Sequence, residues 1–473
     1  MCFRRFVGRG CGMKKSYEID MIHGPLLSRM ILFAVPLMLS GILQLLFNAA
    51  DIIVVGRFSG SQALAAVGST SALINLLVNV FMGLSIGANV LTARYMGARD
   101  ERELHDTVHT SITLSLISGV ALIFIGVLLA RPLLELMGTP EDVIDQATLY
   151  MQIYFVGMPA TMLYNFGSAI LRAVGDTKHP LYFLLVAGVI NAVLNLFFVI
   201  VCHLDVAGVA IATVISQCIS AVLVLLCLVR AEGPYRVDLR KLRIHGRRAL
   251  QIVRVGLPAG IQGAIFSISN VLIQSSVNSF GSVAMAGNSA SSNLEGFIYT
   301  SMNAVYQTSL NFTSQNLGAG KRERLTPILL RCLGIVTAVG AGMGLVFYLL
   351  RFPLLGIYSE DAEVVQFGTL RLTIFCATYF TCGIMDTCCG SIRGLGYSVL
   401  PTIVSLTGAC GLRVLWIFTI FAANRSLTVL YLSYPVSWVI TALAHLICYI
   451  VILRRKGDSI GRPPQGKAAP AQS

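Results

Sequence analysis

The sequence predicts an all-α integral membrane protein in which twelve transmembrane helices form two pseudo-symmetric six-helix lobes around a central cavity. The 473-residue chain is 55% hydrophobic and only 12% charged, with a mean hydropathy of +0.76, which no ordinary soluble domain shows. Apolar stretches long enough to cross about 30 Å of hydrocarbon recur along its whole length. The chain also repeats itself at a spacing of about 221 residues.

The repeat is visible as matching segments. The segment AILRAVGDTKHP (169–180) matches GSIRGLGYSVLP (390–401), and near the start of each half Pro36 pairs with Pro258. Because each copy holds an even number of spans, both copies begin on the same side of the membrane. They are therefore predicted to be parallel repeats related by an axis along the membrane normal.

Residues 1–28 are predicted to form a cytoplasmic N-terminal tail. The first residues are basic but lack an apolar core of about 7 to 15 residues, so they do not resemble a cleavable signal peptide. Either Met1 or Met13 fits as the initiating residue.

The first lobe is predicted to occupy residues 29–230, with spans at 30–51, 63–91, 108–130, 147–171, 181–202 and 206–230. A basic cytoplasmic linker follows at 231–248. The second lobe is predicted at 249–455, with spans at 250–278, 283–312, 327–350, 364–390, 398–421 and 427–453. Residues 456–473 form a predicted cytoplasmic C-terminal tail.

The basic residues set the orientation. Of the 35 Lys and Arg residues, about 29 lie in the tails and even-numbered loops and about 4 in the odd-numbered loops, which predicts that both termini are cytoplasmic in a multi-pass protein of the plasma (inner) membrane. The net charge of +13 does not indicate nucleic-acid binding, because no basic patch carries interleaved aromatic residues. The linker holds the largest basic cluster, which is either simply solvated or held by anionic membrane lipid: Arg236, Arg240, Lys241, Arg243, Arg247 and Arg248.

Motifs that resemble catalytic sites have simpler explanations. Gly83–Gly87 fits GxSxG but lies inside an apolar span, where its glycines are expected to let two helices pack closely. His105 and His109 share a helix face, yet Asp106 stands where a zinc protease needs Glu, so we expect a solvated helix start. No Walker A sequence and no CxxC pair occur. The sequence thus predicts neither an enzyme, nor a cofactor, nor a disulfide framework.

Carboxylates within the spans are the leading functional candidates. Of the 22 acidic residues, only Asp51, Glu295 and Asp386 lie within the predicted spans. Placing a carboxylate at the centre of a span raises the free energy of membrane insertion by about 2.5 to 3.5 kcal/mol. Asp51 lies about 22 residues beyond Arg29, or roughly 33 Å along a helix, which places it toward the outer leaflet.

Polar side chains from three spans are expected to lie near Asp51. Gln44 and Asn48 share its helix face. In the fifth and sixth spans Asn191, Asn195 and Thr213 add neutral oxygens. The set suits either a hard cation such as sodium or a carboxyl that exchanges a proton, although ordinary hydrogen bonding between helices also explains the Asn and Thr residues.

At this point the chain resembles the MATE (multidrug and toxic compound extrusion) transporters of the bacterial kind. The likeness covers about residues 25–455 through these segments: PLMLSGILQLLFNAADIIVVGRF, LRAVGDTKHP, GVAIATVISQ, QNLGAG and IRGLGYSVLP. The resemblance implies two six-helix lobes, alternating access, and secondary active export of cationic or amphipathic compounds in exchange for protons or sodium.

The resemblance also assigns roles to single residues. Asp51 matches the family's acid on the first helix and Pro36 the proline that bends this helix. Asn191 and Thr213 match cation-site positions, and Gln44 and Asn165 match positions that line the cavity.

The departure from the family pattern is Asn195, where many members carry a second aspartate. Because Asn cannot titrate, the first lobe has one carboxylate and carries at most one proton there. A sodium site formed by Asp51, Asn191, Asn195 and Thr213 remains compatible with the residues present.

The second lobe differs chemically from the first. It carries Glu295 and Asp386, together with Arg413 in the eleventh span. Either acid is expected to couple ions or attract substrate within the cavity, or else to neutralise Arg413 as a structural pair. The sequence does not choose between these roles.

Two functions remain after these arguments. The first is multidrug export by a monomer whose partners are membrane lipid and small cationic or amphipathic substrates. The alternative is a lipid-linked oligosaccharide flippase of the same superfamily, whose cavity is expected to carry several basic residues for pyrophosphate, whereas this sequence offers essentially Arg413.

Overall fold

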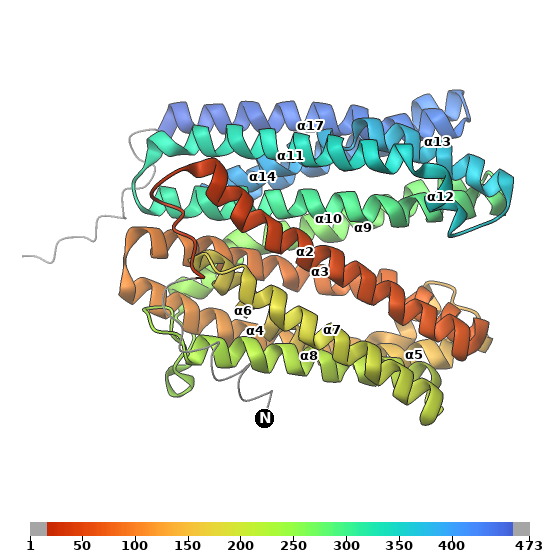
Figure 1. Ribbon diagram of the computed structural model, residues 1–473, viewed down its shortest axis with the longest axis horizontal. Helices are drawn as coiled ribbons and strands as arrows, with labels where there is room; N and C mark the ends of the chain where they lie inside the picture. Colours follow the sequence, from red (N-terminus) through yellow and green to blue (C-terminus); the bar gives the residue numbers. More distant parts are fainter. Residues whose placement is uncertain (1–16, 457–473) are drawn as a thin grey trace, which may run out of the picture.

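The computed structural model describes residues 17–456, and Figure 1 shows that this part of the chain is a bundle of long helices. Its described residues contain no β-strand. The predicted all-α class is therefore confirmed. The predicted Met13 start and the ends of both predicted tails lie outside the described residues.

The first half of the chain forms α2 (Leu26–Phe58), α3 (Gly60–Ala98), α4 (Glu101–Leu136), α5 (Glu141–Val156), α6 (Met158–Val174), α7 (Lys178–Leu196), the π-helical η1 (Phe197–Val201) and α8 (Asp205–Val229). A segment containing the short η2 (Leu239–Lys241) leads to the second half. That half forms α9 (Gly246–Asn278), α10 (Ser282–Gly318), η3 (Arg322–Arg324), α11 (Leu325–Leu349), α12 (Arg351–Gly356), α13 (Ala362–Thr378), α14 (Phe380–Gly394), α15 (Val399–Ser405), η4 (Leu406–Gly411), α16 (Leu412–Trp416), η5 (Ile417–Phe421) and α17 (Leu427–Lys456).

A helix or a run of consecutive helices occupies the position of every predicted span. By length and composition, nine helices of the described chain are apolar enough to cross a membrane, and the bent pair α13–α14 makes a tenth. The other two predicted spans are the pair α5–α6 and α10. The helix α10 is 37 residues long and rich in buried Ser, Thr and Asn. Such a polar helix is tolerated at membrane depth because other parts of the protein surround it.

Two helices are interrupted at identifiable residues. The break between α5 and α6 comes at Gly157, and Pro159 follows in the first turn of α6, where proline needs no hydrogen-bond acceptor for its nitrogen. The α13–α14 pair bends by 48° around Tyr379. In contrast, α2 continues through Pro36 as one helix.

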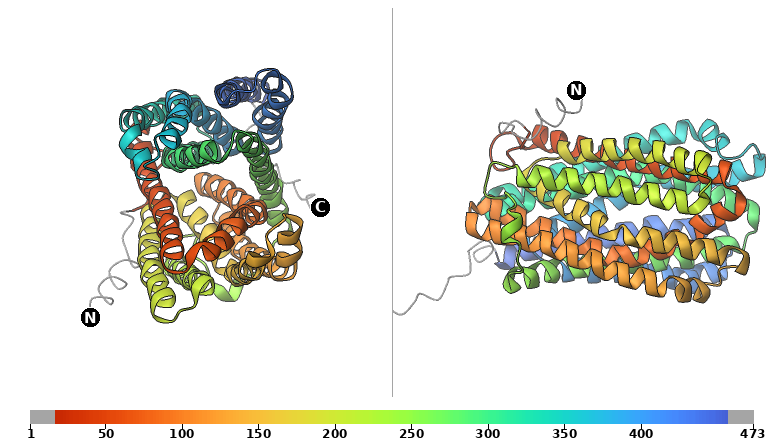
Figure 2. Two further views of the ribbon diagram at one scale, coloured as in Figure 1. Left: turned by 90° about the vertical axis from the view of Figure 1, so that its right-hand side faces the viewer. Right: turned by 90° about the horizontal axis from the view of Figure 1, so that it is seen from below.

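The two largest hydrophobic cores of the described residues lie one in each half of the chain. Figure 2 shows the two groups of helices end-on in its left view. Helix α2 belongs to the first half by sequence, but Met30 and Phe33 in its first turns are buried in the core of the second half. The rings of Phe33 and Phe312 meet edge-to-face at 5.7 Å. The first helix thus bridges the two lobes.

Glycines let α3 and α9 pack backbone against backbone along the seam between the lobes. A Cβ atom on Gly83 would lie 2.2 Å from the nitrogen of Gly260, and one on Gly87 would lie 2.2 Å from the carbonyl oxygen of Ile252. The predicted role of the Gly83–Gly87 segment in close helix packing is confirmed.

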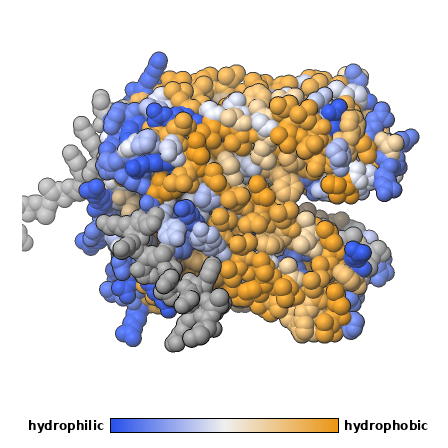
Figure 3. Space-filling view, viewed as in Figure 1, coloured by the Kyte–Doolittle hydropathy of each residue, from blue (hydrophilic) through white to orange (hydrophobic). Residues whose placement is uncertain are grey.

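Both described ends of the chain and the connection between α8 and α9 lie at the left-hand end of Figure 1, which we call the linker end. There the lobes touch: a Cβ on Gly97 would meet Gln315, and one on Gly318 would meet Arg94. At the opposite end, the far end, Figure 3 shows a hollow between the two halves. The molecule is closed at the linker end and open at the far end.

Residues 17–25, which we call the strap, precede α2 and contact both lobes at the linker end. On the first lobe, the Ile19 amide donates to the Gly175 carbonyl at 3.1 Å, and the Tyr235 hydroxyl donates to Glu18 at 2.6 Å. On the second lobe, Asn316 donates to the Met21 carbonyl at 3.0 Å. The strap therefore joins the lobes where they close.

The sequence repeat has a structural counterpart. Gly175 after α6 and Gly396 after α14 both have left-handed backbone conformations, with φ of 102° and 92°. Only glycine adopts such values without strain, which explains why the matched segments share this residue.

Candidate functional site

The first candidate site is a polar cluster between α2 and α7. The Asn191 side-chain amide donates to Oδ1 of Asp51 at 2.8 Å, and the Asn195 amide donates to the same oxygen. The two amides lie one turn apart on α7 and are almost fully buried, whereas Asp51 is partly exposed. Gly188 lies against the Phe47 ring, so α2 and α7 approach closely one turn before the cluster.

Several oxygens of this cluster remain available. Asn195 Oδ1 is buried without a hydrogen-bond partner, and Oδ2 of Asp51 accepts no hydrogen bond from a described residue. Asn191 Oδ1 has only a long 3.5 Å contact from Ser216. Oxygens of one carboxylate and two amides are the donor set that sodium prefers, and an unpartnered buried carbonyl of this kind fits a bound cation.

Two tyrosines close to Asp51 were not predicted. Tyr150 and Tyr154 of α5 lie within electrostatic range of its carboxylate and stack with centroids 6.1 Å apart. Their spacing of one turn within the predicted fourth span was the available signal. They bring a third helix to the site.

The other predicted residues of the first lobe make no hydrogen bond with Asp51, Asn191 or Asn195 among the described residues. The Thr213 hydroxyl donates to the Val209 carbonyl of its own helix at 2.9 Å, and Asn165 donates to Thr161 in the same way at 2.7 Å. Gln44 and Asn48 are exposed on α2 and have no hydrogen-bond partner among the described residues. Their predicted roles in the cation site and the cavity stay predictions.

In the second lobe, Glu295 is paired with an arginine that the sequence analysis did not consider. Both carboxylate oxygens accept from Arg371 of α13, each at 2.8 Å, and Ser291 donates a further hydrogen bond at 2.9 Å. Glu295 and Arg371 are both buried, with 3% and 7% of their surfaces exposed. The expectation that Glu295 neutralises Arg413 is wrong.

The Arg371 guanidinium also contacts groups other than Glu295. It donates to Asn288 at 2.7 Å, and its guanidinium lies 4.3 Å from the centroid of the Phe375 ring. Tyr431 of α17 donates to the same Asn288 oxygen at 3.2 Å. Glu295 therefore belongs to a network that ties α10, α13 and α17 together.

Asp386 and Arg413 do not form an ion pair either. Asp386 is partly exposed, lies within electrostatic range of Arg393 and Arg413, and has no basic group within 4.0 Å among the described residues. Arg413 donates to Ser437 at 2.9 Å and lies 4.3 Å from the centroid of the Tyr434 ring. The expected structural pair of Asp386 with Arg413 is therefore absent from the described residues, and a role of Asp386 toward ions or substrate stays a prediction.

An aromatic wall was also missed by the sequence analysis. Phe375, Tyr379, Tyr434 and Trp438 form a continuous group with ring centroids 4.9 to 5.7 Å apart. Both Arg371 and Arg413 lie against this wall. Phe375, Tyr434 and Trp438 are buried in the core of the second half, and only Tyr379 is partly exposed.

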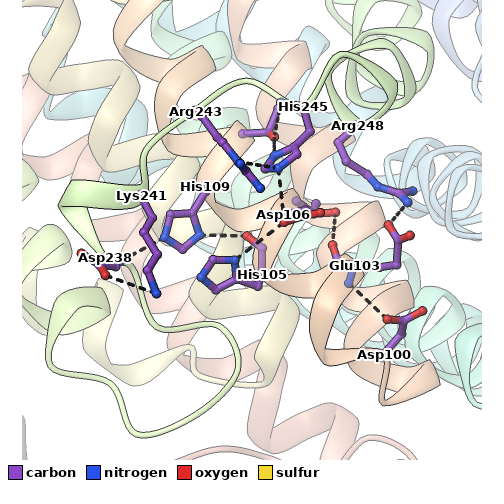
Figure 4. A network of polar contacts seen from close by, with 12 residues as sticks. Asp100, Glu103, His105, Asp106, His109, Asp238, Lys241, Arg243, His245 and Arg248 are labelled. Atoms are coloured by element: carbon purple, nitrogen blue, oxygen red, sulfur yellow. Dashed lines mark hydrogen bonds and ion pairs between the residues drawn. The ribbon is translucent and has the colours of Figure 1, made fainter.

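The histidine pair on α4 is not a solvated helix start. His109 is fully buried: one ring nitrogen contacts the His105 carbonyl at 2.8 Å, and the other accepts the Asp238 amide hydrogen at 3.0 Å. Figure 4 shows these residues at the connection between α8 and α9. The earlier expectation is wrong because the connecting segment folds back over α4.

A family model described as MatE matches the chain twice, at residues 36–197 and 258–419. The two matches begin about 222 residues apart and fall one in each lobe. The predicted internal repeat is thereby confirmed.

Two curated proteins illustrate the similarity. "Probable multidrug resistance protein YoeA" of Bacillus subtilis (strain 168) is 28% identical over 435 residues, which cover 90% of this chain and 94% of that protein. The "FAD transporter" of Shewanella oneidensis is 24% identical over 355 residues, covering 73% of this chain and 78% of that protein.

Solved structures share the fold. One described as the "Outward-facing conformation of a multidrug resistance MATE family transporter of the MOP superfamily" superimposes with a TM-score of 0.86 at 20% identity, covering 93% of this chain and 99% of that one. The described chain therefore shares its fold with that protein.

Proposed function

This chain belongs to the MatE family of membrane transporters, and from that premise we propose that it exports cationic or amphipathic compounds in exchange for protons or sodium ions. The names of similar proteins, among them multidrug resistance proteins, support the substrate class. The protein is a multi-pass membrane transporter and not an enzyme.

One observation carries the proposal: the cluster of Asp51 with Asn191 and Asn195. A carboxylate inside a membrane span is expensive unless it has partners, and here both amides converge on one of its oxygens. The second oxygen is left for a proton or a cation. Asp51 thus has the chemistry of a group that changes its occupancy during a transport cycle.

Two coupling ions fit this cluster. A proton would bind the free Asp51 oxygen, and a sodium ion would also use the amide oxygens of Asn191 and Asn195. Position 195 holds Asn and not a second carboxylate, so the first lobe carries at most one proton per cycle.

One coupling ion supplies enough free energy. A pH difference of one unit gives about 1.4 kcal/mol, and a membrane potential of 100 mV gives about 2.3 kcal/mol per charge. Together they sustain a concentration ratio of about 500 for an exported compound.

We propose that ion binding at Asp51 changes the shape of α2 at Pro36. Helix α2 lies between the lobes and is anchored in the second core by Met30 and Phe33, so a bend at Pro36 would alter the space between the lobes. Asn165, Asp386 and the partly exposed Tyr379 would then meet the substrate in that space. An acidic and an aromatic group favour cationic compounds.

We further propose that the protein lies in the plasma membrane as a monomer, with the linker end in the cytoplasm. The support is the distribution of Lys and Arg, which are concentrated in the tails and in the loops of that end.

The decisive experiment is Asp51→Asn in a strain that lacks other exporters. Loss of the only carboxylate in the first-lobe cluster should abolish export of a cationic dye and reduce drug resistance to the level of the empty vector. Asp142→Asn, the same change at an exposed position on α5, is the matched control and should keep full resistance. Full resistance of the Asp51→Asn strain, at normal membrane levels of protein, would reject the proposal.

Vesicle assays separate the coupling ions and the alternative substrates. Dye export that collapses with a protonophore indicates proton coupling, whereas export that requires sodium indicates a sodium site. Because one relative is named a FAD transporter, FAD is the anionic comparison substrate. Movement of a labelled lipid-linked sugar, with no dye export, would favour the flippase alternative.

A further inference from the structure

Helix α9 has one continuous exposed face that changes character along its length. Between Arg247 and Ile268 its exposed residues recur at spacings of three, four or seven, which places them on one side of the helix. These residues are Arg247, Leu250, Arg254, Leu257, Ile261 and Ile268. The first part of this face is basic, and the remainder is apolar.

Between Arg247 and Ile268 the remaining residues of α9 are buried or partly buried. Gly256 and Gly260 lie against the backbone of α3, and Gln262 accepts a hydrogen bond from Arg393 inside the second lobe at 2.7 Å. The exposed face is thus turned away from both, and from Leu257 to Ile268 its exposed side chains are all aliphatic. In a helix that is long and apolar enough to cross a membrane, such a face meets lipid chains.

The two arginines lie where this lipid-facing surface begins. Leu250 lies between them and is 68% exposed, and Arg254 precedes Leu257 by three residues, or about 4.5 Å. Neither Arg247 nor Arg254 has a hydrogen bond or ion pair with another described residue. Arginine in this position extends its guanidinium toward the lipid headgroups.

The preceding segment is held firmly in place. The His245 amide donates to Thr110 at 3.2 Å, the Asp238 amide donates to His109, and Arg248 pairs with Glu103 (Figure 4). Because Arg248 is committed to this inner network, Arg247 points to the outside of the helix. The network therefore fixes which arginine faces protein and which faces lipid.

We propose that Arg247 and Arg254 form a binding site for the phosphate of an anionic phospholipid, whose acyl chain lies along Leu250 and Leu257. The two cations bracket an exposed leucine on one helix face, so a charged headgroup and an apolar chain are matched by the same surface. The site lies on α9, which forms the seam with α3, and a lipid bound there contacts the helix along which the lobes meet.

The test measures lipids retained by the purified protein. Native mass spectrometry after incubation with phosphatidylglycerol and phosphatidylcholine should show selective retention of phosphatidylglycerol. Each cation near a membrane surface changes anionic-lipid affinity about fivefold, so Arg247→Gln with Arg254→Gln should weaken phosphatidylglycerol binding by about 25-fold. The Lys variants at both positions should keep most of the binding, which also shows that the double change does not act through misfolding.

The matched control removes the same charge elsewhere. Arg57→Gln with Arg425→Gln changes two exposed arginines of the far end that have no partner among the described residues, and phosphatidylglycerol binding should stay at the wild-type level. Unchanged phosphatidylglycerol binding in the Arg247/Arg254 variant would overturn the proposal. Displacement of the lipid by inorganic phosphate would overturn it as well, because a site that includes the acyl chain discriminates against the free anion.

Discussion

At the scale of single residues, the pair of Glu295 with Arg371 gives the sharpest prediction. Arg371→Leu leaves Glu295 as a buried charge without a partner, which costs about 3 to 5 kcal/mol. Glu295→Leu combined with Arg371→Met removes both charges and should recover most of that stability. Melting of the purified protein in detergent measures the three variants.

The same double variant decides whether Glu295 also couples ions. If the pair is purely structural, the double variant should export dye at a rate close to that of the wild type. Loss of export from a protein that melts normally would instead mean that Glu295 takes part in transport, and would contradict a purely structural role for the pair.

The sequence predicted part of the candidate site for a clear reason. Asn191 and Asn195 are one turn apart, and their amides do converge on Asp51. Periodicity within a helix is a local property, so it can be read from the chain. The partner of Glu295 is 76 residues away, and its identity depends on how α10 and α13 are rotated against each other, which no local pattern specifies.

At the scale of helices, the close contact of α3 with α9 predicts the effect of adding volume. Gly260→Leu would place a side chain where the Val80 carbonyl already lies 2.3 Å from the Cβ position, so the helices must separate. We expect a loss of about 1 to 3 kcal/mol of stability and at least a tenfold loss of export. Thermal melting and dye efflux check both effects.

Gly342→Leu on α11 is the control, because nothing lies within 4 Å of the Cβ position there. It should melt and export as the wild type does. Equal damage from the two substitutions would mean that the contact of α3 with α9 does not explain the result, because Leu favours a helix more than Gly does at both positions.

The strap predicts an acid-sensitive contribution to stability. Burial alone would raise the pKa of Asp20, but hydrogen bonds from the His23 and Ile22 amides outweigh it and hold the pKa below its ordinary value of 3.8. A lowered pKa means that the ionised form stabilises the fold above about pH 4, and that this contribution disappears as the pH falls through the lowered pKa.

The corresponding variant is Asp20→Ala. It should melt at a lower temperature than the wild type near neutral pH, by an amount equivalent to about 1 kcal/mol for two lost hydrogen bonds. In strongly acidic buffer the difference between the two proteins should vanish. A difference that stays constant with pH would show that the Asp20 carboxylate plays no part in holding the strap.

The helices themselves were predictable because each span needs about 20 apolar residues, and runs of that length are visible in the sequence. The breaks were less visible. Gly157 interrupts one predicted span and Tyr379 another, and a break there depends on contacts from neighbouring helices. The strap was missed altogether, since its hydrogen bonds to Gly175 and Asn316 use backbone groups that every residue has.

At the scale of the whole molecule, the contacts between the lobes are unevenly placed. The glycine contacts of Gly97 with Gln315 and of Gly318 with Arg94 lie at the linker end, together with the strap. The hollow of Figure 3 lies at the far end. In the export cycle proposed above, with the linker end in the cytoplasm, substrate enters only after the linker-end contacts break. The proposed cycle therefore requires the loss of these contacts.

Joining the lobes at the linker end should therefore stop transport. Gln315 donates to the Ala173 carbonyl at 2.6 Å, which brings the second lobe directly against the first. With the native cysteines replaced, Ala173→Cys and Gln315→Cys linked by a short cleavable reagent should abolish dye export, and reduction should restore it. Linking Ser309→Cys to Ser391→Cys, two positions in contact within the second lobe, should leave export intact. If the first link left export unchanged, the lobes would not need to separate there, and a rocking motion of two rigid halves would be the wrong description of this protein.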